Sequence, residues 1–168
     1  MANNNKLLYY TVQLPSHTLT TPHHTMSTYL ITGASRGIGL ELTKQLLDLD
    51  PSKVSKVIAL SRGNPSPGLD DLLSTHTNRL HHVSGAVDDN ASIKQAAEKV
   101  TELLKGNTGL DVLVNNAGVP SYTPDGIANM TDDGFANVLD VNVIGVHRVT
   151  SAFLPLLEAG KGKKVINV

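Results

Sequence analysis

The sequence has no cysteine, no long hydrophobic run and no excess of charge of one sign. The absence of cysteine among its 168 residues excludes disulfides and thiolate metal sites, and it fits a reducing compartment such as the cytoplasm. No apolar run is long enough to cross a bilayer, so no membrane partner is expected. The 14 basic and 15 acidic side chains nearly balance, which argues against nucleic acid as a partner.

Residues 1–27 differ in composition from the rest of the chain. They are rich in Asn, Thr, His and Pro, and Lys6 is their only charged side chain. Their apolar stretch is too short for a signal-peptide core, and they contain no arginine, which argues against a mitochondrial presequence. We expect either a disordered extension or a mis-assigned one, with Met26 as the true start. Their histidines lack any fixed geometry, so no metal site is expected; they are His17, His23 and His24.

A glycine-rich turn follows, between a short apolar run and a helical pattern. The run 29–31 is typical of a buried parallel strand, and apolar residues at 38, 42, 46 and 49 predict a helix that Asp50 and Pro51 close. Strand, glycine turn and helix in this order indicate a cradle for dinucleotide phosphates at the helix N-terminus. A glycine-rich turn without a ligand is the alternative.

The glycines of this turn have separate expected roles. Gly33 permits a tight turn with unusual backbone angles. Gly37 has no side chain that would hold a pyrophosphate away from the backbone, and Gly39 lets the helix lie close to the sheet. The candidate cofactor-binding residues of the turn are Gly33, Ser35, Arg36, Gly37, Ile38 and Gly39.

Past the turn, strand and helix patterns alternate. Further strands are expected at 56–60, 79–85, 111–114 and 164–168. Helices are expected at 69–75, from a cap among Asp88, Asp89 and Asn90 to Gly106 or Gly109, and from Thr131 to about Glu158. Such alternation predicts an α/β fold with a doubly wound parallel sheet, the Rossmann fold, truncated after the fifth strand.

Four motifs resemble the short-chain dehydrogenase/reductase family. They are Thr32 with the spacing Gly-x-x-x-Gly-x-Gly, Asn115-Asn116-Ala117-Gly118 directly after a strand, Asn142 within the long helix, and the strand 164–168. The nearest branch is that of small NADPH-dependent carbonyl reductases. The resemblance implies that residues 28–168 form an incomplete NAD(P)-binding Rossmann domain, the N-terminal portion of such a protein, and it adds as cofactor-binding candidates Asn115, Ala117 and Gly118.

The end of the second strand bears on the choice of cofactor. NAD binding needs an acid there for the ribose hydroxyls, but the sequence is Leu60-Ser61-Arg62-Gly63. Arg62 can pair with a 2′-phosphate, Ser61 can hydrogen-bond it, and Arg36 lies close enough in the chain to help. These residues favour NADP (NADPH) over NAD, with solvated surface arginines as the alternative.

Two cofactor-side positions are less regular. The family places an Asp after the third strand against the adenine, where this chain has Ala86. Either a neighbour, Asp88 or Asp89, substitutes for it or the contact is lost. Backbone contacts from Val87 could remain, so Val87 is a candidate and adenine binding should be somewhat weaker.

Arg148 could lie on the cofactor side, although a surface position is the alternative. His147 and the pair His81-His82 are expected to be partly exposed without a catalytic role.

The resemblance also implies the chemistry. In the family a Tyr is the general acid, a Lys four residues later lowers its pKa, a Ser orients the carbonyl, and an Asn helps to hold a water. Asn142 is therefore the candidate catalytic residue, with a helix-kinking role as its alternative. No Tyr-x-x-x-Lys occurs in the 168 residues, so we expect the chain as given to lack the other three groups and to be inactive by itself.

The expected function is thus that of an NADP-dependent oxidoreductase that reduces a carbonyl or oxidises an alcohol on a small molecule. A non-catalytic nucleotide-binding remnant, or pseudoenzyme, is the alternative. Only the loop 119–130 could contribute to a substrate wall, and its sequence does not identify the substrate. The fifth strand should lie at an open sheet edge, and in the family the long helix often forms a dimer contact. The helix 131–158 is therefore a candidate surface for self-association.

Overall fold

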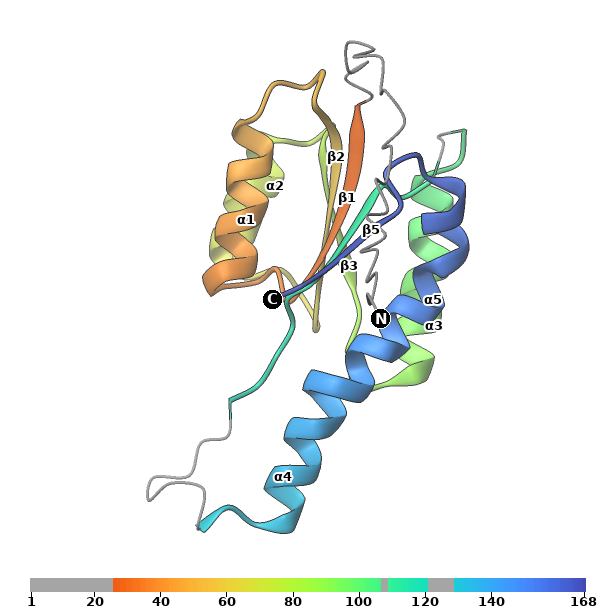
Figure 1. Cartoon of the computed structure of the whole chain (residues 1–168). Coiled ribbons are helices and arrows are strands. Elements are labelled where there is room, and N and C mark those ends of the chain that lie inside the picture. The colour runs from red at the N-terminus through yellow and green to blue at the C-terminus, as the bar shows by residue number, and fades with distance from the viewer. Residues whose placement is uncertain (1–25, 107–108, 121–128) are drawn as a thin grey trace, which may run out of the picture.

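The computed structural model describes residues 26–106, 109–120 and 129–168. The expectations for the N-terminal extension, including its three histidines, concern residues outside these ranges, as does most of the loop 119–130. The parallel strands form one five-stranded sheet in the order β3-β2-β1-β4-β5 (Figure 1). Their bounds are β1 Ser27–Thr32, β2 Val54–Ser61, β3 Leu80–Ser84, β4 Val112–Asn115 and β5 Lys164–Asn167.

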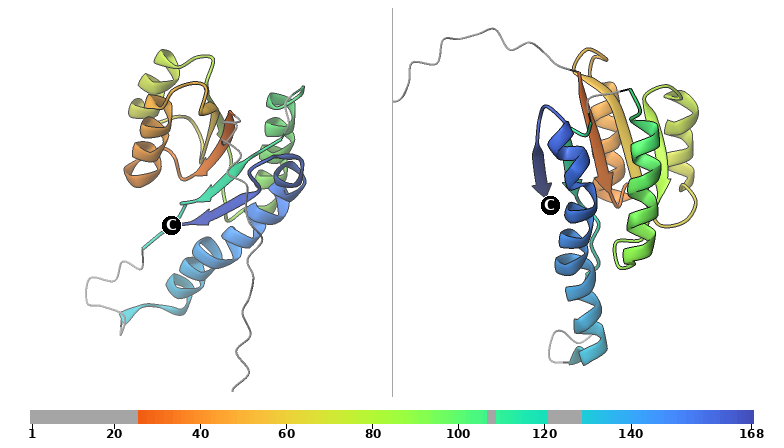
Figure 2. Two further views of the ribbon diagram at one scale, coloured as in Figure 1. Left: turned by 45° about the horizontal axis from the view of Figure 1, so that its top comes forward. Right: turned by 90° about the vertical axis from the view of Figure 1, so that its right-hand side faces the viewer.

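Helices cover both faces of this sheet, which confirms the doubly wound Rossmann fold (Figures 1 and 2). Helices α1 (Gly37–Asp48) and α2 (Pro67–Thr75) cover one face, and α3 (Asn90–Leu103) and α5 (Gly145–Ala159) cover the other. Each face has its own hydrophobic core, one around Leu69 and Ile31 and one around Phe153 and Leu113. The strand order reverses direction between β1 and β4, which is where ligands bind in folds of this type.

The apolar face predicted for the first helix is partly wrong. Ile38 and Leu49 are 62% and 43% exposed. The face that packs on the sheet is instead formed by Gly39, Thr43 and Leu47. Thr43 can be buried there because its hydroxyl donates to the Gly39 carbonyl over 2.8 Å, which satisfies its polar group within the helix.

Side chains cap three of the other helices at their N-termini. Ser66 caps α2, so that helix starts two residues earlier than predicted, at Pro67. Asp89 is the cap of α3, since its carboxylate accepts from the Ala91 and Ser92 amides. Thr131 caps α4 (Asp132–Leu139), as the sequence predicts.

The expected long helix forms, but it contains a π-helical segment. Helix α4 runs through η2 (Asp140–Ile144) into α5 without a break. Asn142 lies in η2. The irregularity in the helix is thus at the residue for which the sequence analysis gave helix kinking as the alternative to a catalytic role. Such π segments insert an extra residue into the helix and are common at functional sites.

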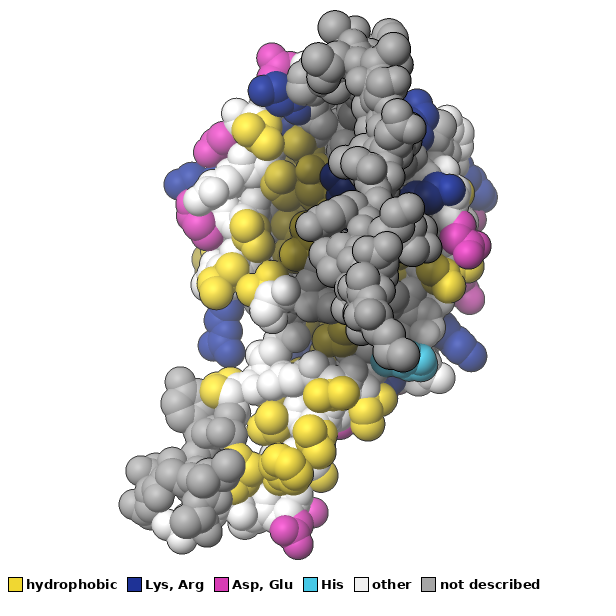
Figure 3. Space-filling model, viewed as in Figure 1, with side chains coloured by type: hydrophobic (Ala, Val, Ile, Leu, Met, Phe, Trp, Pro, Cys, Tyr) yellow, Lys and Arg dark blue, Asp and Glu magenta, His cyan; other side chains and the backbone are white. Residues whose placement is uncertain are grey.

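The N-terminal half of this long helix, formed by α4 and η2, has exposed apolar side chains. Figure 3 shows hydrophobic side chains gathered over it. Their exposed fractions range from 41% to 58%, and they belong to Phe135, Leu139, Val143 and Ile144. Strand β5 is exposed along its whole length at the sheet edge, as expected. No helix in the described ranges is long and apolar enough to cross a membrane.

Candidate nucleotide-binding site

A cavity of about 620 Å³ opens at the carboxyl ends of the strands, where the strand order reverses. It brings together most of the residues proposed from the sequence, namely Gly33, Ser35, Arg36, Gly37, Ile38, Ser61, Arg62, Val87, Ala117 and Gly118. Four proposed residues do not line it, namely Gly39, Asn115, Asn142 and Arg148. Of the five other lining residues, Asp88 is an alternative to the missing adenine-side Asp, whereas four had not been predicted to line the cavity, namely Gly85, Asn116, Val119 and Val141.

The glycine turn has the backbone that its sequence requires. Gly33 and Gly37 have φ angles of +68° and +56°, which L side chains rarely adopt. A Cβ on Gly39 would lie 2.4 Å from the Gly33 carbonyl oxygen, whereas one on Gly37 would meet nothing within 4 Å. Gly39 therefore allows the helix to pack on the turn, and Gly37 leaves open space beside the cavity.

The N-terminus of α1 is available to a ligand. Its N-cap residue, Arg36, has an extended backbone and makes no side-chain cap hydrogen bond. By contrast, a side chain caps each of α2, α3 and α4. First-turn amides that no side chain caps, together with the positive end of the helix dipole, suit a phosphate. The cavity thus fits the pyrophosphate of a dinucleotide.

Two side chains fix the turn against the loop that follows β4. The Thr32 hydroxyl oxygen accepts from the Asn116 and Ala117 amides, each over 3.0 Å. The Asn116 side-chain amide donates back to the carbonyls of Thr32 and Gly33, over 3.0 and 3.3 Å. The two motifs that suggested the family therefore form one hydrogen-bonded unit.

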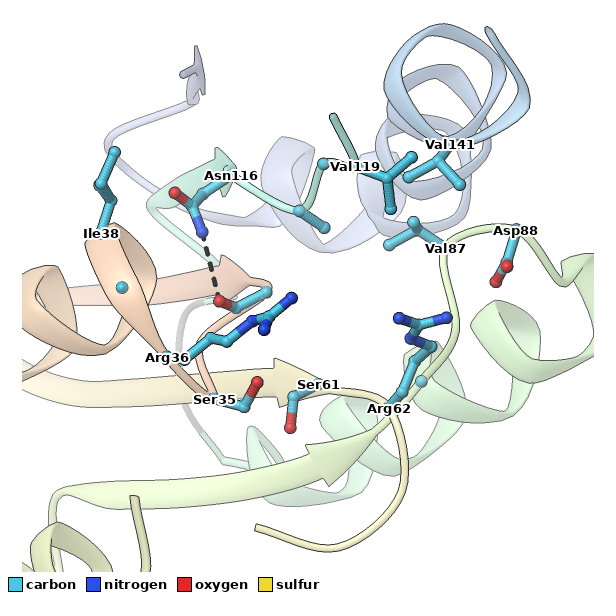
Figure 4. Close-up of a pocket in the computed structure, with 15 residues that line it drawn as sticks. Ser35, Arg36, Ile38, Ser61, Arg62, Val87, Asp88, Asn116, Val119 and Val141 are labelled. Carbon is cyan, nitrogen blue, oxygen red and sulfur yellow. Dashed lines mark hydrogen bonds between the residues drawn. The ribbon is translucent and has the colours of Figure 1, made fainter. Parts of the chain in front are cut away.

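Two arginines give one end of the cavity a positive charge. Figure 4 shows the guanidinium groups of Arg36 and Arg62 extending into the same space, with Ser35 and Ser61 below them. Both arginines are exposed, whereas Ser61 is only 4% exposed and its hydroxyl lies 3.0 Å from Nε2 of His82. Asp88 is the one acid among the described residues that line the cavity.

The two histidines of β3 are partly buried, as expected, and burial affects both. Desolvation lowers the pKa of His81, and the positive charge of Lys56 lowers it further. Desolvation also lowers the pKa of His82, while Asp70 on α2 opposes this effect. Both imidazoles therefore favour the neutral form more strongly than a free histidine does.

Arg148 is not a surface residue, so that alternative is wrong. Its side chain is 16% exposed and pairs with Asp140 over 3.1 Å. It also donates to the carbonyl of Val87. This arginine therefore fixes the backbone of Val87, which lines the cavity, to the first residue of the π-helical segment.

Asn142 and Asn115 lie beside a second cavity of about 390 Å³, which shares Ala117, Gly118 and Val119 with the first. The side chain of Asn142 bonds both the amide and the carbonyl of Val119, each over 2.9 Å. The side-chain amide of Asn115 donates to the Thr150 hydroxyl and to the side-chain Oδ1 of Asn167, and its own Oδ1 is buried without a partner among the described residues. Those residues include no cluster of acids and histidines that could hold a metal ion.

Comparison with known protein families matches residues 27–168 to short chain dehydrogenases. The chain belongs to this family. Short-chain dehydrogenase/reductase AacuF of Aspergillus aculeatus is 38% identical over 149 residues, which are 85% of this chain and 54% of the relative. Family membership implies a nicotinamide nucleotide as cofactor.

Solved structures agree with this assignment. NADPH-bound carbonyl reductase from chicken fatty liver is 39% identical, with a TM-score of 0.71 over 80% of this chain and 52% of that one. The carbonyl reductase Sniffer of D. melanogaster is 30% identical, with a TM-score of 0.70 over 80% of this chain and 53% of that one. The chain thus spans about half the length of the relatives that it matches.

Proposed function

We propose that the 620 Å³ cavity binds NADP(H), and that residues 28–168 are the cofactor-binding part of an oxidoreductase. The observation that carries this proposal is the N-terminus of α1, which has no side-chain cap and open space at Gly37. Its amides would hold the pyrophosphate. Val87 and Asp88, after β3, would border the adenine, while Ala117 and Gly118 would border the sugar on the nicotinamide side.

NADP rather than NAD is the proposed cofactor because of the charge at the end of β2. A 2′-phosphate is a dianion at neutral pH and suits two guanidinium groups, here those of Arg36 and Arg62. Ser61, which is buried and lines the same cavity, adds a hydroxyl at this end. No acid stands at residues 60–63 to accept hydrogen bonds from a free ribose hydroxyl. The similar carbonyl reductase from chicken fatty liver has NADPH bound in its crystal structure, which supports the same choice of cofactor.

The proposed reaction is hydride transfer between the nicotinamide and a carbonyl or alcohol of a small molecule. The cofactor supplies the hydride, and the residues of this chain bind and orient it. Gly39 and Arg148 would act from behind the cavity, through the packing of α1 and the position of Val87. Asn115 and Asn142 would shape the reaction side, since both line the second cavity.

The groups that transfer the proton are not found as Tyr-x-x-x-Lys in residues 1–168. We therefore propose that the chain by itself binds the nucleotide without turnover, whether as the first part of an enzyme or as a non-catalytic binding protein. We place it in the cytoplasm. The exposed apolar side chains of α4 and η2 support self-association through the helix 131–158.

The test is to measure dissociation constants for NADPH and NADH with the parent chain and with Arg62→Asp. The charge reversal should raise the dissociation constant for NADPH at least about tenfold, which is about 1.4 kcal/mol. The dissociation constant for NADH should change by less than about twofold. Lys99→Asp, an equal charge change at an exposed position on α3, is the control and should affect neither. Equal weakening of both nucleotides by Arg62→Asp would contradict the NADP assignment.

A further inference from the structure

The Ser61 hydroxyl, at the end of β2, has a partner that its own strand does not supply. In the parallel register His82 of β3 lies opposite Ala59, two residues before Ser61. The two side chains therefore lie diagonally on the same face of the sheet, within reach of each other. The distance from Oγ of Ser61 to Nε2 of His82 is 3.0 Å, a normal hydrogen bond.

We propose that His82 is a positioning residue for NADP selectivity: its Nε2–H donates to Ser61 and thereby directs the Ser61 hydroxyl proton to the 2′-phosphate. The inference rests on the proposed binding of NADP(H) and assigns to it a residue outside the cavity lining. It adds a determinant of selectivity that neither the charge pattern of the turn nor that of the second strand contains.

The number of protons on the Ser61 hydroxyl limits which contacts it can make. A serine hydroxyl has one proton to donate and can also accept. If His82 accepted that proton, the oxygen lone pairs of Ser61 would face a phosphate that is itself rich in acceptors, and the contact would be repulsive. If His82 donates instead, the Ser61 proton is free for a phosphate oxygen. Binding of the anion therefore selects the arrangement in which Nε2 carries a proton.

The surroundings of His82 allow this arrangement. Burial lowers the pKa of His82 and Asp70 of α2 opposes the effect, yet a neutral imidazole still carries one N–H and can donate from Nε2. His81, the next residue on β3, points to the opposite face of the sheet, where Lys56 of β2 is its charged neighbour. His81 is thus a matched control of the same residue type on the same strand.

The experiment uses the full chain and two small probes, adenosine 2′,5′-bisphosphate and 5′-AMP, which differ only in the 2′-phosphate. The parent chain should bind the bisphosphate more tightly. His82→Leu should weaken binding of the bisphosphate about three- to tenfold, the range for one hydrogen bond to a charged group. It should leave the affinity for 5′-AMP unchanged. His82→Gln, whose side-chain amide can also donate, should restore most of the selectivity. His81→Leu should have no effect on it.

A double-mutant cycle then tests the pairing. In the Ser61→Ala background, His82→Leu should cause no further loss, because the hydroxyl that it orients is gone. An equal loss with and without Ser61 would overturn the proposal. So would unchanged selectivity in His82→Leu. If the parent chain itself does not distinguish the two probes, the proposed NADP preference fails, and this outcome is separate from the other two.

A measurement without mutation is available if His82→Leu does not fold. The ¹⁵N chemical shifts of the His82 ring report which nitrogen carries the proton. In the presence of saturating adenosine 2′,5′-bisphosphate, Nε2 should be protonated. An unprotonated Nε2 in that complex would overturn the proposal.

Discussion

Asn142 holds the backbone of Val119 through two hydrogen bonds, one from the Val119 amide to Oδ1 and one from Nδ2 to the Val119 carbonyl, each of 2.9 Å. The two residues belong to different elements, since Asn142 lies in the π-helical segment η2 and Val119 follows β4. Both polar atoms of the amide are thereby used within the chain. The contact supports a positioning role for Asn142, because it fixes a residue that lines both cavities.

Replacing Asn142 should release Val119. In Asn142→Ala both hydrogen bonds are lost, and because the contact is exposed we expect a loss of about 1 kcal/mol in the free energy of unfolding. The local effect should be larger: hydrogen exchange at the Val119 amide should be faster than in the parent chain. Asn137→Ala, at an exposed position on α4, is the control. An unchanged exchange rate at Val119 would show that Asn142 does not hold this loop.

The glycines of the turn should respond differently to alanine. Gly39→Ala places a Cβ 2.4 Å from the Gly33 carbonyl oxygen, so α1 must shift and we expect a loss of about 3 kcal/mol in unfolding free energy. Gly37→Ala meets open space and should cost about 1 kcal/mol for its positive φ. The new methyl of Gly37→Ala faces the proposed pyrophosphate position. This variant should therefore bind NADPH much more weakly than the parent chain, although its effect on stability is small. Chemical denaturation and NADPH titration of both variants would show whether the order is reversed.

The pKa of His81 gives the fold a pH dependence with a definite sign. Burial lowers this pKa in the folded chain, below the ordinary value of 6.5. The unfolded chain therefore binds more protons in the window between the two values. The stability that neutral His81 contributes is fully present above pH 6.5 and is lost as the pH falls through the lowered pKa. The melting temperature should fall on acidification.

His81→Leu removes this titration and should flatten the profile below pH 6.5. Thermal melts at several pH values between about 5 and 8 would measure the difference. A profile that is as steep in His81→Leu as in the parent chain would show that other groups cause the acid sensitivity.

Patterns that act within a few residues were sufficient to predict most of the fold. The strand–turn–helix order placed the glycine turn, and Asp89 and Thr131 were among the predicted helix caps, because caps and turns depend on neighbours in the chain. The helical face of α1 was misplaced, since the close packing at Gly39 rotates the buried side toward Thr43. Apolar spacing cannot reveal that a glycine and a self-satisfied threonine form the packed face.

The parts of the site that could not be predicted depend on contacts between distant residues. Arg148 reaches the Val87 carbonyl across 61 positions of sequence, and Ser61 meets His82 only through the register of β2 and β3. The π-helical segment likewise has no local composition that distinguishes it from an ordinary helix. Such features follow from how whole elements pack and were visible only in the folded chain.

The central claim, that the cavity at the N-terminus of α1 binds NADP(H), is tested most directly by an NMR titration of the ¹⁵N-labelled chain with NADPH. We predict saturable shifts of the Gly33, Gly37 and Ile38 amides, together with the side-chain N–H signals of Arg36 and Arg62, while the amides of α4 remain unchanged. Absence of saturable shifts at the glycine turn with millimolar NADPH would contradict the account.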